Sequence, residues 1–112
     1  MMWQSYNKYG NHKCTYKGIR FDSKKECQYF IYLEALEAQG KISELKRQVR
    51  FTLQPSFKHQ GKTIRAITYV ADFTYVDSDG KYHIIDTKGV KTDVYLLKKK
   101  IMQFQGHEIE EV

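Results

Sequence analysis

The chain has 112 residues, the size of one small domain, and 41% of them are apolar, which is ordinary for a globular protein. No apolar run approaches the roughly 20 residues needed to cross a bilayer, and the N-terminus has no apolar signal segment. Nineteen basic and thirteen acidic residues give a formal net charge of +6, which favours an anionic partner such as nucleic acid. Two cysteines are too few for a disulfide framework, so we expect a cytoplasmic protein with no membrane partner, in which Cys27 is simply packed in the interior.

The basic residues are concentrated in three segments, 1–20, 41–65 and 88–100, while most acids lie between these segments and at the C-terminus. Acids set among basic segments are typical of a metal site inside a phosphate-binding groove. The alternative interpretation is a mildly basic surface that serves only solubility.

The first seventeen residues mix tryptophan and tyrosine with lysine, asparagine and glycine, without any period. They predict a basic aromatic arm over 1–17 that contacts nucleic acid, or alternatively a frayed terminus. The remaining residues, 18–112, are expected to form the single domain.

A helix is predicted over about 23–39. Ser23 followed three residues later by Glu26 is a capping box, and Gly40 is placed to end the helix. The helix carries an apolar stripe that includes Tyr29 and Leu33.

Alternating apolar residues predict a strand over 48–54, followed by a loop over 55–61. One long strand or a bent pair is expected over 63–76, then a turn over 77–80 and a return strand over 81–87. A second helix is expected over about 93–105, capped by Thr92 or Asp93, and the last six residues can add a short strand. The core stripe of this second helix is predicted to be Val94, Leu97, Ile101 and Phe104, with Lys98, Lys99 and Lys100 facing away. The order of elements predicts a small α/β or α+β domain.

Two aspartates are expected to meet on adjacent strands. If Ser78, Asp79 and Gly80 form a three-residue hairpin turn, Asp72 lies opposite Asp86. Side chains repeat every two residues along a strand, so Lys88 shares a face with Asp86.

Carboxylates held about 4 to 5 Å apart repel each other by about 1 to 4 kcal/mol. Such a pair needs either a shared proton or a bound cation. Oxygen ligands select a hard ion, so the expected cofactor is Mg²⁺, for which Mn²⁺ can substitute, and no small-molecule cofactor is expected. Glu26 lies at the edge of the helical apolar stripe, where it either caps the helix or adds a third carboxylate to the metal site.

The string Ala71-Asp72-Phe73, followed by Ile85-Asp86-Thr87-Lys88-Gly89 and preceded by a helix with Glu26, resembles the PD-(D/E)XK nuclease superfamily. The nearest likeness is to small phage and prophage proteins regarded as Holliday-junction-resolvase-like, over about residues 16–112. The resemblance implies a restriction-endonuclease-like core, a mixed central sheet with one helix before and one after the catalytic hairpin.

The resemblance also implies the roles of the residues. Asp72 and Asp86 would ligate the metal, the backbone carbonyl of Thr87 would complete the ligand set, and Glu26 would serve a second metal or a water relay. Lys88 would position the attacking water. Two departures from the superfamily pattern are Ala71, where proline is common, and the shorter acid at Asp86.

The expected function is therefore a metal-dependent DNA endonuclease acting on duplex or branched DNA, working as a homodimer because one chain carries one site. The alternatives are a phage nicking or end-processing nuclease, and a nucleic-acid-binding module of the same fold without catalysis. Contacts to the DNA backbone are expected from basic residues in three regions of the chain: Lys13, Lys17, Arg20, Lys91, Lys98, Lys99 and Lys100.

Overall fold

The computed structural model describes residues 13–87 and 89–112. Two helices and eight strands occur in this part of the chain, in the order β1 (Cys14–Tyr16), β2 (Ile19–Phe21), α1 (Lys24–Ala38), β3 (Ile42–Gln54), β4 (Phe57–His59), β5 (Lys62–Ile64), β6 (Ile67–Asp77), β7 (Tyr82–Asp86), α2 (Asp93–Phe104) and β8 (Ile109–Glu111). The predicted mixture of helices and strands is confirmed, and the fold is α+β.

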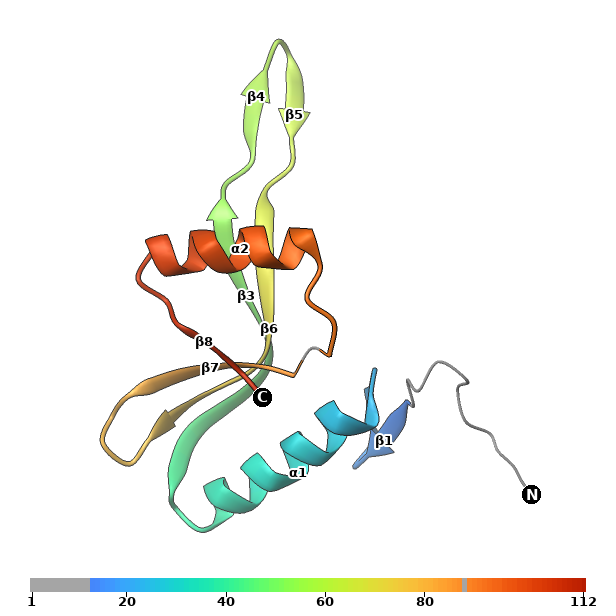
Figure 1. Ribbon diagram of the computed structural model, residues 1–112, viewed down its shortest axis with the longest axis vertical. Helices are drawn as coiled ribbons and strands as arrows, with labels where there is room; N and C mark the ends of the chain where they lie inside the picture. Colours follow the sequence, from blue (N-terminus) through green and yellow to red (C-terminus); the bar gives the residue numbers. More distant parts are fainter. Residues whose placement is uncertain (1–12, 88) are drawn as a thin grey trace, which may run out of the picture.

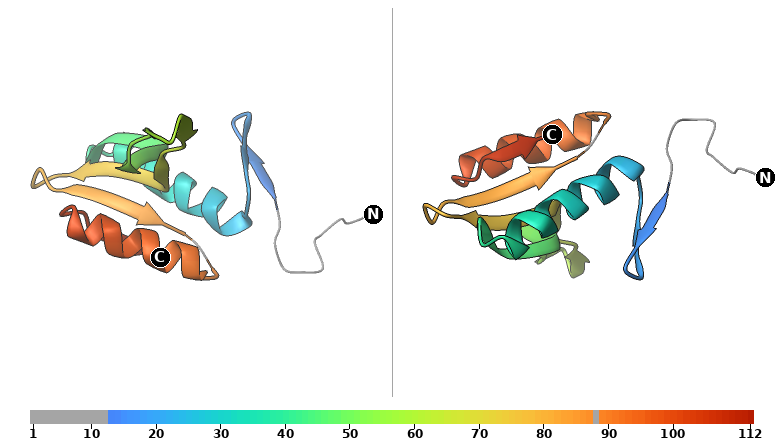
Figure 2. Two further views of the ribbon diagram at one scale, coloured as in Figure 1. Left: turned by 90° about the horizontal axis from the view of Figure 1, so that it is seen from above. Right: turned by 90° about the horizontal axis from the view of Figure 1, so that it is seen from below.

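The central sheet has the strand order β3-β6-β7-β8, in which β7 and β8 are parallel and the other neighbours are antiparallel. The helices cover opposite faces of this mixed sheet (Figures 1 and 2). Under α1, Phe73 and Ile85 join the helix residues Phe30 and Leu33 in one core. Under α2, a second core holds Ala71, Ile84 and the helix residues Tyr95 and Met102. No helix among the described residues is long and apolar enough to span a membrane, and the assignment to the cytoplasm stays a prediction.

The first helix has the ends that its sequence predicts. The side chain of Ser23 accepts a hydrogen bond from the backbone N–H of Glu26 at 3.1 Å, which satisfies one of the free donors of the first turn. At the other end Gly40 has a φ of 76°, a conformation that glycine adopts without strain, and the N–H of Lys41 bonds back to the carbonyl of Leu36 at 3.0 Å.

The predicted turn between β6 and β7 is also confirmed. Gly80 has a φ of 84°, and the N–H of Asp77 donates to the carbonyl of Lys81 at 2.8 Å. This turn fixes the register, which pairs Val76 with Tyr82 and Phe73 with Ile85. Asp72 and Asp86 are the next two residues in that register.

The loop predicted over 55–61 is wrong at residues 57–59, which form β4. Its residues belong to an antiparallel hairpin in which β4 and β5 pair from Phe57–Ile64 to His59–Lys62. Pro55 cannot donate to a ladder, and it interrupts the strand only locally, because Gln54–Ile67 and Phe57–Ile64 follow the same register on either side. We call residues 55–66 the projecting hairpin, since they extend away from the sheet (Figure 1).

The core stripe predicted for the second helix is wrong as well. Thr92 caps α2 as expected, but the buried residues are Tyr95 and Met102. Val94, Leu97 and Phe104 are 61%, 59% and 90% exposed, while Lys98 and Lys99 are partly buried. A tyrosine and a methionine one heptad apart therefore define the inner face, and the stripe of aliphatic residues lies outside.

The N-terminal arm predicted over 1–17 lies largely outside the described residues. The proposed boundary at residue 17 falls at the turn of the β1–β2 hairpin, whose residues Cys14 and Tyr16 pack against the core under α1. Cys27 is buried as expected, and it is joined to Cys14 by a disulfide, which the sequence analysis did not anticipate. The disulfide fastens this hairpin to α1.

Candidate functional site

The β6–β7 ladder ends at Phe73 and Ile85, and two carboxylates follow at this point. Beyond it, β7 continues to pair only with β8, where the N–H of Val112 donates to the carbonyl of Asp86 at 3.0 Å. Between β6 and β7, where the ladder has ended, the side chain of Asp72 takes the place of a backbone partner. Its Oδ2 accepts hydrogen bonds from the backbone N–H and the hydroxyl of Thr87, both at 2.8 Å. We call Asp72, Asp86 and Thr87 the sheet fork.

The strand geometry explains why a polar side chain occupies this position. Tyr69 and Ala71 belong to the core under α2, but Phe73, with the same parity, belongs to the core under α1. The strand therefore changes the face that it presents at Asp72. The neighbouring strand is irregular at the same place, since Gln48 has a φ of 52°. Asp72 is thus placed between the two cores rather than in either of them.

Asp86 is fully buried, with 0% of its surface exposed. Its Oδ2 accepts a hydrogen bond of 2.6 Å from the hydroxyl of Tyr69. Burial, followed by this bond to Asp86, raises the pKa of Tyr69 far above its ordinary value. Charge on Asp86 and on Asp72 contributes to the raised pKa of both Tyr69 and Tyr95, so the two carboxylates act on the same group of phenols.

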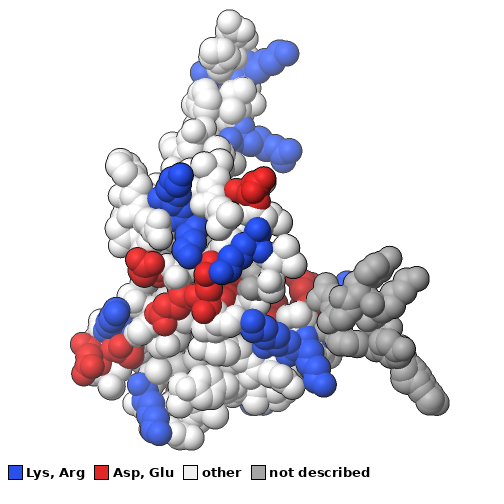
Figure 3. Space-filling model, in the orientation of Figure 1, with Lys and Arg blue, Asp and Glu red and all other residues white. Residues whose placement is uncertain are grey.

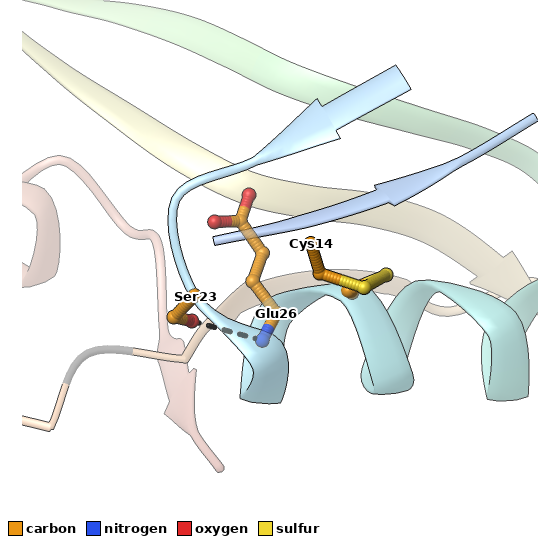
Figure 4. Close-up of a disulfide and its surroundings, with 4 residues drawn as sticks. Cys14, Ser23 and Glu26 are labelled. Atoms are coloured by element: carbon orange, nitrogen blue, oxygen red, sulfur yellow. Dashed lines mark hydrogen bonds between the residues drawn. A yellow bond between two sulfur atoms is a disulfide. The ribbon is translucent and has the colours of Figure 1, made fainter. Parts of the chain in front are cut away.

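Glu26 lies in the first turn of α1, and its side chain projects away from the helix cap that its backbone N–H forms with Ser23 (Figure 4). It is only 6% exposed, and its Oε2 accepts a hydrogen bond of 3.1 Å from the side-chain amide of Gln48. Burial, and then the negative charge of Asp72, raises the pKa of Glu26 to about 7, although nearby Arg47 opposes the shift. Its backbone completes the helix cap with Ser23, while its carboxyl is directed to Gln48, so the predicted capping role accounts for the backbone only.

The residues at the sheet fork offer only oxygen atoms to a ligand, which is the donor chemistry that Mg²⁺ prefers. Among residues 13–87 and 89–112, no three histidine, cysteine or acidic side chains lie together in a way that could hold a metal ion. The donor set that fits is therefore the pair Asp72 and Asp86 with the backbone carbonyl of Thr87. A small ligand set suits Mg²⁺, which usually binds through one or two carboxylates and keeps several waters or substrate oxygens.

The other predicted residues are distributed as follows. Lys88, the predicted catalytic lysine, lies outside the described residues. Several predicted DNA contacts are engaged with acids of the chain itself: Lys17 with Glu34 at 3.3 Å, and Lys91 and Lys99 with Glu111, both at 3.1 Å. Lys13, Arg20 and Lys100 are exposed, and Lys98 lines a hollow of about 270 Å³ between β6 and α2.

Sequence reasoning missed two residues of the site, Gln48 and Tyr69. Gln48 follows from the same register argument as Asp86, because the pairs Arg47–Phe73 and Val49–Ala71 place it opposite Asp72. Tyr69 had no comparable signal, since an aromatic residue in a strand is ordinarily explained by packing.

The comparisons with known proteins give one positive result. A family model described as "Protein of unknown function (DUF1064)" matches residues 6–112. This chain belongs to the DUF1064 family. No curated protein and no solved structure is significantly similar to it. The matched region of the DUF1064 chain includes α1, the sheet fork and α2, so the family model spans every element of the candidate site.

Proposed function

We propose that this DUF1064 protein is a Mg²⁺-dependent DNA endonuclease with a PD-(D/E)XK-type site on a restriction-endonuclease-like core. The observation that carries the proposal is the sheet fork, where Asp72 and Asp86 follow the last pair of the β6–β7 ladder and offer only oxygen donors. Two further features support the proposal: the mixed sheet has one helix on each face, and Glu26, Asp72 and Asp86 follow one another along the chain in the order of the superfamily pattern.

In this proposal Asp72, Asp86 and the carbonyl of Thr87 hold the divalent ion, which when bound neutralises charge on the phosphate oxygens. The bond from Thr87 fixes the carboxylate of Asp72, and the bond from Tyr69 fixes that of Asp86. Both carboxylates are thus oriented before substrate arrives, which lowers the cost of assembling the site. Lys88 would hold the water that attacks phosphorus.

Glu26 is suited to a proton-holding role at the edge of this site. Its pKa of about 7 lets it exist in both protonation states near neutral pH. Its contact with Gln48 orients the carboxyl from the neighbouring strand. We assign to it the transfer of a proton to or from a water beside Asp72.

The second candidate is a DNA-binding module of the same fold without catalysis. The observation that favours it is the complete burial of Asp86, since a ligand must gain access to that carboxylate before it can serve a metal. The basic balance of the chain, with a net charge of +6, agrees with either candidate.

A panel of linear, nicked, flap and four-way DNA substrates, each incubated with Mg²⁺ or with EDTA, tests the proposal. We expect cleavage with Mg²⁺, none with EDTA, and none by Asp86→Ala at either condition. Asp79→Ala is the matched control, because it removes the same charge from the exposed β6–β7 turn. Binding without cleavage of any substrate would favour the silent module. Paired nicks on the four-way substrate, together with a dimer mass by light scattering, would support a resolvase that acts as a homodimer.

A further inference from the structure

The projecting hairpin is the most strongly basic feature that the sheet fork leaves unused. Every charged residue between Glu44 and Asp72 is basic: Lys46, Arg47, Arg50, Lys58, Lys62 and Arg65. The last three belong to the hairpin and are exposed. On the face shown in Figure 3, the projecting end of the molecule carries Lys and Arg side chains and no acidic ones.

These cations differ from three of the lysines that the sequence favoured as DNA contacts. Lys17, Lys91 and Lys99 form ion pairs with acids of the same chain. Within the described residues, the hairpin cations have no such pair, and Lys58 only donates to the hydroxyl of Thr63 at 2.7 Å. Their charge is therefore available to an external anion.

The hairpin also has the shape of a DNA-binding ribbon. Two strands of β-structure fit the major groove of duplex DNA, which is about 12 Å wide. The hairpin keeps the register of the last β3–β6 pair, Gln54 with Ile67, so its two strands extend β3 and β6 beyond the sheet after a short interruption. Phe57 and Ile64 are cross-strand partners, 45% and 38% exposed, and present an apolar pair of the kind that contacts thymine methyl groups.

We propose that the projecting hairpin grips duplex DNA beside the cleavage site, with Lys58, Lys62 and Arg65 on the phosphates and Phe57 and Ile64 toward the bases. The proposal extends the proposed function, on which it rests for the choice of DNA as the anion. A second copy of the chain is the disfavoured occupant, because two such hairpins packed on each other would bring like charges together. Strand β6 leads from the hairpin to Asp72 of the fork, so DNA held by the hairpin lies on the same strand as the proposed cleavage site (Figure 1).

Binding of a fluorescein-labelled duplex of about 30 base pairs, measured by anisotropy in EDTA between 50 and 200 mM NaCl, tests the inference. The variant K58A/K62A/R65A should weaken binding by about 30-fold and reduce the slope of log K against log salt by about 2 to 3. The matched control K41A/K46A/K81A removes three exposed lysines at the opposite end of the sheet, and it should change affinity by less than about threefold. Phe57→Ala should weaken binding without changing the slope.

Equal losses in the two triple variants would overturn the inference, as would a failure of the wild type to bind duplex at 50 mM salt. A change from dimer to monomer in light scattering of K58A/K62A/R65A would identify the hairpin as a contact between copies and would also overturn it. The outcomes separate the two proposals. If the wild type binds through the hairpin but cleaves nothing, only the nuclease proposal fails; if it cleaves and the hairpin variant binds normally, only the hairpin proposal fails.

Discussion

The sheet fork and the projecting hairpin are connected by β6 and differ in how their charged side chains are placed. Asp86 of the fork and Glu26 beside it are buried, and each accepts a hydrogen bond from another element. At the hairpin Lys58 and Lys62 are exposed and free of ion pairs within the described part of the chain. Burial raises the pKa of Glu26 and so makes the stability of the protein depend on pH, whereas the exposed cations of the hairpin contribute little to stability and remain available to an external anion.

The largest effect expected from this contrast belongs to Asp72. Asp72→Asn keeps an oxygen that can accept the two bonds from Thr87 but removes the charge, so Mg²⁺-dependent cleavage should fall about a thousandfold. Anisotropy in EDTA should show that the affinity for duplex DNA stays within about threefold of the wild type. A variant that cleaves at the wild-type rate would remove the fork from the mechanism.

The next effect concerns stability and pH at Glu26. The folded pKa of about 7 lies above the ordinary value of 4.5, so the folded protein keeps a proton that the unfolded chain releases in this window. Raising the pH from 4.5 to 7 should therefore cost the fold about 3 kcal/mol at this residue, and the cost should be complete above pH 7.

Urea unfolding in EDTA across this pH range measures the cost. Glu26→Gln cannot titrate, so its stability should fall less steeply with pH than that of the wild type. Glu108→Gln, on the exposed segment before β8, should keep the wild-type slope. Parallel pH profiles for the wild type and Glu26→Gln would contradict the assignment.

A smaller loss is expected from Tyr69→Phe. The substitution removes the hydroxyl that donates to the buried carboxylate of Asp86 and should lower the free energy of unfolding by about 2 kcal/mol. Tyr82→Phe is the control, because Tyr82 is 48% exposed and should lose less than about 0.5 kcal/mol by the same urea measurement. Equal stability of the two variants would mean that the bond to Asp86 contributes nothing.

The smallest effect separates the two regions most clearly. K58A/K62A/R65A, which should weaken DNA binding strongly, should change the free energy of unfolding by less than about 0.5 kcal/mol, because its side chains are exposed. Thermal unfolding of the variant and the wild type at one salt concentration checks this. A large loss of stability would show that the hairpin contributes to the fold itself.

Local signals predicted the parts of the structure that local chemistry determines. Ser23 and Gly40 define the ends of α1, and Gly80 defines the turn that brings Asp72 and Asp86 to adjacent positions. The buried face of α2 could not be predicted from such local signals. Val94, Leu97 and Phe104 have helical spacing, but tertiary packing buries Tyr95 and Met102 instead.

Long-range contacts explain the remaining misses. The bond between Gln48 and Glu26 joins residues 22 positions apart, and no periodicity in either segment encodes it. The first strand of the projecting hairpin, β4, falls in the predicted loop over 55–61, because it follows Pro55 and is only three residues long. The two strands of the hairpin keep the register of the last β3–β6 pair, Gln54 with Ile67, and this pairing is a property of both strands together that neither sequence shows alone.

The pairing of Gln54 with Ile67, at the base of the projecting hairpin, has an evolutionary consequence. Because register is already set there, residues can be gained or lost in matched pairs near Gly61 without displacing Asp72. The length of the hairpin and the position of Asp72 in the sheet are therefore structurally independent of each other.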